Sequence, residues 1–138
     1  MSEAERDLNT LLISMKPALD PREWVYCSVD RSFLQTAHKP LFVFHESEGT
    51  TVVIERNQAE SLHLTYAFVS RRITLRVHSD LEAVGFLATV TTELAKHMIP
   101  ANAVSAFYHD HIFVPIDRAE EALHVLETLS AERARALL

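Results

Sequence analysis

The chain contains 138 residues, of which 48% are apolar, and carries a formal net charge of −6 at pH 7, a balance typical of a folded domain rather than a disordered segment. The acidic charge and the lack of a basic stripe argue against nucleic acid as a partner. A single cysteine and only two glycines exclude an intramolecular disulfide, a cysteine-based metal cluster, a Walker loop and a dinucleotide-binding fingerprint.

The first half of the chain predicts one helix followed by strands. Three leucines and a methionine at helical spacing predict a helix near residues 8–15, which ends at Lys16-Pro17. The polar stretch 30–40 is typical of a loop. Three strands and a short helix complete this half, predicted at residues 24–29, 41–45, 51–55 and 57–64.

The second half begins with residues 66–78, in which Ile73, Leu75 and Val77 alternate with polar residues and predict a half-buried strand. Ser79 and Glu82 match a capping box, so we expect a helix to begin there and to carry Leu81 and Val84 on its apolar stripe. Two strands joined by a turn at 108–111 follow, and a second capping box precedes the last helix. These elements are predicted at residues 103–107, 112–114 and 119–138, with Asp117 and Glu120 as the second capping box.

Neither half alternates strand and helix in the regular manner of a parallel sheet. The order of elements favours an α+β protein of two small modules, each with helices on one face of an antiparallel sheet. We place the modules at residues 1–66 and 67–138. Because about 70 residues are marginal for independent stability, we expect the modules to share an interface.

Several segments carry a resemblance to a known family. The most specific are residues 77–87 and the run Phe-Tyr-His-Asp-His-Ile-Phe-Val-Pro at 107–115. With them the chain resembles the short tandem ACT-domain proteins, and residues 7–17 and 48–56 resemble that family's first module. The resemblance covers nearly the whole chain.

The resemblance implies a ferredoxin-like βαββαβ fold for each module and a regulatory role through binding of a small molecule, commonly an amino acid. Related tandem modules occur in amino-acid kinases and in cytosolic arginine sensors. Pairing of modules through sheets or helices is implied as well, so we expect a homodimer. A chain that consists only of sensor modules is expected to act through ligand-dependent contacts with a regulated protein partner.

In such domains the ligand lies between modules, held by the loop from the first strand into the first helix and by the second strand. The matching positions here are Ser79, Asp80, Leu81, Glu82, Val84, Gly85 and Phe86 of the loop and Asn102 and Val104 of the second strand. A helix N-terminus can hold a carboxylate, and Asp80 or Glu82 could hold an ammonium group. A zwitterionic amino acid suits this set, although helix capping alone also explains it.

Two departures from the family pattern stand out. The usual glycine after the first helix is missing from residues 95–100, so we expect Pro100 to end that helix in place of a left-handed cap. The first module shows no clear helix between residues 29 and 41, so its own ligand loop is expected to be missing.

Two alternatives remain open at this point. One alternative to the ligand-binding regulator is a dimerisation module without a ligand, and the other is a metal-binding protein centred on His109 and His111. The metal hypothesis is the weaker one, because a metal site needs three or four ligands and only these two histidines are placed together. Turn chemistry at Asp110 explains the segment better than a metal does.

The sequence favours a binding protein over an enzyme, because no nucleophile stands beside an obvious base, and no cofactor motif is present. The acidic segment 1–7 does not have the pattern of a secretory signal. No apolar run reaches the ~18 residues that a membrane span requires. We therefore expect a cytoplasmic protein with no membrane partner.

Overall fold

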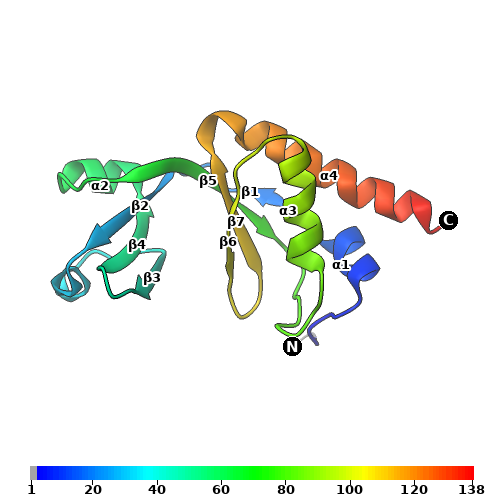
Figure 1. Ribbon diagram of the computed structural model, residues 1–138, viewed down its shortest axis with the longest axis horizontal. Helices are drawn as coiled ribbons and strands as arrows, with labels where there is room; N and C mark the ends of the chain where they lie inside the picture. The colour runs from blue at the N-terminus through cyan, green and yellow to red at the C-terminus, as the bar shows by residue number, and fades with distance from the viewer. Residues whose placement is uncertain (1–2) are drawn as a thin grey trace. The chain divides into compact units, whose positions relative to one another are not determined.

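The computed structural model describes residues 3–138, and these form two compact units. Unit 1 consists of the described residues up to Pro21 together with Arg71–Leu138, and unit 2 of Arg22–Ser70. Strand β5 (Ala67–Leu75) crosses the boundary, so its first residues belong to unit 2 and its last to unit 1. Figure 1 shows the elements of both units.

Unit 1 has the ferredoxin-like arrangement. Its strands lie in the order β1-β5-β7-β6, and β1 and β6 pair antiparallel with β5 and β7. The elements are α1 (Leu8–Ser14), β1 (Ala18–Leu19), β5, α3 (Phe86–Lys96), β6 (Asn102–Ser105), β7 (Asp110–Pro115), the 3₁₀ turn η2 (Ile116–Arg118) and α4 (Ala119–Ala136). In chain order from β5 this is βαββα, and β1 takes the position of the fourth strand.

The first residues of the chain thus belong with its second half. We predicted that the N-terminal helix is part of the first module, which we ended at residue 66, whereas α1 packs against α3 and α4 in unit 1 (Figure 1). The reason is burial, because Leu11, Leu12 and Met15 are fully buried in the core of unit 1. That core also contains Ile73, Leu75, Phe86, Val90, Leu94, Ile99, Ile112, Val114, Ala119, Ala122, Val125, Leu126 and Leu129.

Unit 2 repeats the same topology in a reduced form. Its strands lie in the order β3-β4-β2-β5, and a 3₁₀ turn replaces the first helix. The elements are β2 (Trp24–Val29), η1 (Arg31–Gln35), β3 (Phe42–His45), β4 (Thr50–Glu55), α2 (Arg56–Ser61) and the start of β5. Val25, Cys27, Val52, Ile54 and Ala59 form its core.

Helix α3 begins later than predicted. Ser79 does not cap it, and residues 79–85 form a loop instead of its first turns. The N-cap is Gly85, whose φ of +91° is readily accessible to glycine. Leu81 and Val84, which we placed on the buried stripe, are 67% and 84% exposed. The second capping box was also wrong, because Asp117 lies in η2 and α4 begins at Ala119 after an N-cap at Arg118.

The end of α3 corrects another expectation. Met98 takes the left-handed conformation that we expected to be lost with the missing glycine, with φ of +57°. Its N–H donates to the Ala95 carbonyl, and the Ile99 N–H donates to the Leu94 carbonyl, which is the Schellman pattern.

A side chain at a left-handed position costs about 1–2 kcal/mol, and Met98 is 81% exposed. Met98→Gly relieves this strain but also raises the conformational entropy of the unfolded chain, which offsets part of the gain. We therefore expect a net stabilisation of about 0.5–1 kcal/mol in urea unfolding. Lys96→Gly, within the same helix, is the control and should destabilise it by about 1 kcal/mol. Equal losses for both variants would contradict this account of the cap.

Within the described part of the chain, none of the helices combines the length and the apolar character that a membrane span requires.

Candidate functional site

A cavity of about 170 Å³ lies in unit 1 where the loop after β5 enters α3. The loop and the first turn of α3 line it together with one residue each from the adjacent ends of β6 and β7. The lining residues are Ser79, Asp80, Leu81, Ala83, Gly85, Phe86, Leu87, Ala88, Ser105 and Asp110.

The N-terminus of α3 presents backbone donors to this cavity. The first intrahelical bond runs from the Thr89 N–H to the Gly85 carbonyl, so the N–H groups of Phe86, Leu87 and Ala88 have no partner inside the helix. Gly85 has no side chain that could cap them. These donors and the helix dipole favour a negatively charged group at this end of the cavity.

Asp110 supplies the opposite charge. It is the first residue of β7, pairs in register with Ser105 of β6, and is only 6% exposed. Its carboxylate accepts a hydrogen bond of 3.0 Å from the Ser79 hydroxyl. A buried carboxylate is costly unless it is hydrogen-bonded or paired, so this position favours a cationic group in the cavity.

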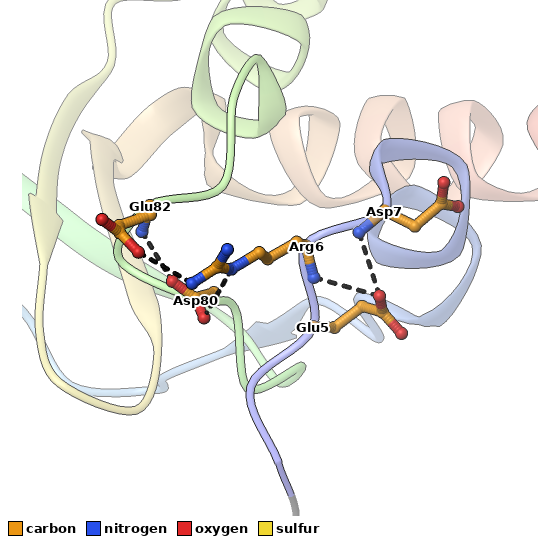
Figure 2. Close-up of polar contacts among 5 residues, drawn as sticks. All are labelled: Glu5, Arg6, Asp7, Asp80 and Glu82. Atoms are coloured by element: carbon orange, nitrogen blue, oxygen red, sulfur yellow. Dashed lines mark hydrogen bonds and ion pairs between the residues drawn. The ribbon is translucent and has the colours of Figure 1, made fainter.

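The outer side of the loop is bound by the segment that precedes α1 (Figure 2). Arg6 forms ion pairs with Asp80, at 3.0 Å from Nε to Oδ2, and with Glu82, at 2.7 Å from Nη2 to Oε2. The Glu82 N–H and the Arg6 guanidinium hold the pKa of Asp80 below its ordinary value. Asp7 caps α1 by accepting a hydrogen bond from the Thr10 N–H. The segment before α1 is therefore bonded to the loop through Arg6 and to α1 through Asp7.

Our predicted ligand residues divide into two groups. Ser79, Asp80, Leu81, Gly85 and Phe86 line the cavity, whereas Glu82, Val84, Asn102 and Val104 are not among its lining residues. The predicted set left out five residues that also line the cavity, namely Ala83, Leu87, Ala88, Ser105 and Asp110. Strand alternation could have indicated that Ser105 and Val104 point to opposite faces, but the register that places Ser105 beside Asp110 is a tertiary feature.

The histidines of the β6–β7 hairpin do not assemble into a metal site in the structure. The ring centroids of His109 and His111 are 6.4 Å apart, and His111 Nδ1 lies 3.0 Å from the Thr74 hydroxyl. Burial, with Arg72 and His109 nearby, lowers the pKa of His111. Residues 3–138 contain no group of three or more His, Cys, Asp or Glu side chains placed to hold a metal ion.

Unit 2 has a hollow at the topologically equivalent place. It measures about 530 Å³ and is bordered by the end of β2, the start of η1 and the β3–β4 turn. Its lining includes Asp30, Arg31, His45, Glu46 and Glu48. The first internal bond of η1 runs from the Phe33 N–H to the Asp30 carbonyl, so this turn leaves two backbone donors without an internal partner, against three at the start of α3.

Comparison with known proteins assigns the family. ACT-domain family models match residues 3–71 and 68–128. A Vibrio cholerae protein of unknown function, described as a possible transport protein, is 39% identical and superimposes with a TM-score of 0.79, covering 89% of this chain and 95% of that one. A search of the curated proteins found no match.

More distant structures share the fold. The aspartokinase α and β subunits are 12% identical with a TM-score of 0.59, covering 82% of this chain and 95% of the other. The regulatory subunit of the Thermus flavus aspartate kinase is 8% identical with a TM-score of 0.60, over the same shares of the two chains. The chain belongs to the ACT-domain family, with two ACT domains in tandem, an arrangement typical of ligand-binding regulatory modules.

Proposed function

We propose that this protein is a regulatory amino-acid-binding protein whose ligand occupies the unit 1 cavity. The α-carboxylate would accept hydrogen bonds from the N–H groups of Phe86, Leu87 and Ala88, and the α-ammonium would pair with Asp110. The volume of the cavity, about 170 Å³, favours an amino acid with a small side chain.

The observation that carries this proposal is that one cavity is lined by groups of opposite charge preference. The start of α3, whose first backbone N–H groups have no partner inside the helix, and the carboxylate of Asp110, which is 6% exposed, line the same cavity. A zwitterion satisfies both preferences at once, whereas a simple anion or cation satisfies one. Charge-assisted hydrogen bonds of this kind are about twice as strong as neutral ones.

The output of such a protein is a change in its contacts. A ligand shifts a conformational equilibrium only by its differential affinity for the two states, and the loop of residues 79–85 is the element that both touches the cavity and reaches the surface. Leu81, Val84, Phe107 and Tyr108 are exposed on unit 1. We propose that these apolar side chains contact a second copy of the chain or a regulated protein.

A thermal-shift screen against the twenty amino acids, followed by calorimetric titration, tests the function. We expect one or a few small amino acids to stabilise the protein, by about 2.7 kcal/mol at a concentration of 100 times Kd. A folded protein that none of the twenty stabilises would contradict the proposal. If that protein is a dimer in light scattering, the result would favour a dimerisation module without a ligand.

A further inference from the structure

Arg6 pairs with two carboxylates of the loop, one of which lines the cavity. Asp80 is itself a lining residue, and Glu82 lies two residues further along the loop. The single guanidinium of Arg6 reaches both, at 3.0 Å and 2.7 Å (Figure 2). Without Arg6 the lining would carry the carboxylates of Asp80 and Asp110, with the Glu82 carboxylate two residues beyond Asp80, and no cation stands among the residues that line the cavity.

The backbone fixes Arg6 in this place. The Glu5 N–H donates to the His78 carbonyl at 2.8 Å, and the Asp80 N–H donates to the Glu5 carbonyl at 2.8 Å. Glu5 and Ser79 thereby form a parallel β-bridge. The Glu5 carboxylate also accepts from the N–H groups of Arg6 and Asp7. Because two main-chain bonds anchor the residue before it, Arg6 reaches the loop at a small entropic cost compared with a free surface side chain.

This arrangement bears on the charge that a ligand can carry. A carboxylate entering the cavity approaches Asp80 as well as the donors of α3, and an unneutralised Asp80 would repel it. We propose that Arg6 determines the charge specificity of the cavity: by pairing with Asp80 and Glu82 it allows a ligand carboxylate to bind at α3 and leaves Asp110 to bind the ligand's cation. The assignment of ligand carboxylate and cation rests on the function proposed above.

The two halves of a zwitterion serve as separate probes. Binding of acetate and of methylammonium is followed by NMR chemical shifts of the amides of residues 79–88 and 110, in the full-length chain. In Arg6→Gln we expect acetate to bind about tenfold more weakly and methylammonium about tenfold more tightly. The reason is that Asp80 then adds one uncompensated negative charge to a partly solvated cavity.

Three further variants separate charge from loop structure. Arg6→Lys keeps the charge and should retain most of the acetate binding. Arg6→Gln combined with Asp80→Asn removes both charges and should restore acetate binding to near the native value. Arg56→Gln is the matched control, because Arg56 likewise bridges two carboxylates, Glu23 and Glu60, but in unit 2. It should change neither probe.

Each result supports or overturns the proposal. An unchanged acetate-to-methylammonium preference in Arg6→Gln, a loss that the double variant does not reverse, or no acetate binding to the native protein would overturn it. The proposed function is tested separately, because it fails if none of the twenty amino acids binds the native protein. The change in preference between acetate and methylammonium can still be measured in that case, since neither probe is an amino acid.

Discussion

Replacing Asp110 by asparagine should weaken amino-acid binding by roughly 10- to 100-fold, since a hydrogen bond to a charged group contributes about 1.5–3 kcal/mol. Asparagine has the same shape, and its amide oxygen can still accept the hydrogen bond from Ser79. The substitution therefore removes the charge and leaves the wall of the cavity in place. Calorimetric titration with the amino acid found in the screen gives the change in Kd.

The control for this variant is Asp117→Asn. Asp117 lies in η2, outside the residues that line the cavity, and its substitution changes the net charge of the chain by the same amount. Its Kd should equal the native value. The N-acetylated form of the ligand provides a second check, because it lacks the ammonium group: it should bind the native protein weakly and lose little further affinity in Asp110→Asn. Equal losses for ligand and analogue would contradict the role of Asp110.

Leu126→Ala should destabilise the protein by about 2–5 kcal/mol, the range measured for leucine truncation in close-packed cores. Leu126 is fully buried on α4, within the core that α1, α3 and α4 share with the sheet of unit 1. For a domain whose total stability is about 5–15 kcal/mol, this loss would be visible as a large decrease of the urea midpoint.

Leu81→Ala is the matched comparison, because the sequence pattern assigned Leu81 to the apolar stripe of a helix. The structure places Leu81 in an exposed loop, so its truncation should change the free energy of unfolding by no more than about 0.5 kcal/mol. Similar losses for the two variants would show that residues 79–85 are packed as a helix, and would contradict the loop on which the candidate site depends.

Local sequence patterns predicted most of the secondary structure. The alternation in 73–78, the apolar run in 24–29 and the helical spacing in 8–15 correspond to parts of β5, to β2 and to α1. The two periodic patterns succeed because one face of the element is buried, so the period of apolar residues follows the geometry of the backbone. The ACT-type α+β fold predicted from the resemblance is confirmed by the family matches and the strand orders.

The loop between β5 and α3 shows where local patterns fail. Ser79 and Glu82 have the spacing of a capping box, yet the Ser79 hydroxyl donates to Asp110, a residue 31 positions away. The Glu82 carboxylate pairs with Arg6, 76 positions away. A local motif describes which bonds a side chain can make, whereas long-range partners decide which of them it does make.

Composition, periodicity and family resemblance therefore established the class of fold and the main elements, and they indicated part of the lining of the candidate cavity. Tertiary structure alone decided that the N-terminal strand completes unit 1, that the loop stays open until Gly85, and that Asp110 lines the same cavity as the start of α3. These features depend on strand register and on contacts between segments remote in sequence. These contacts stabilise the protein only when both segments are in place, so no local sequence pattern indicates them.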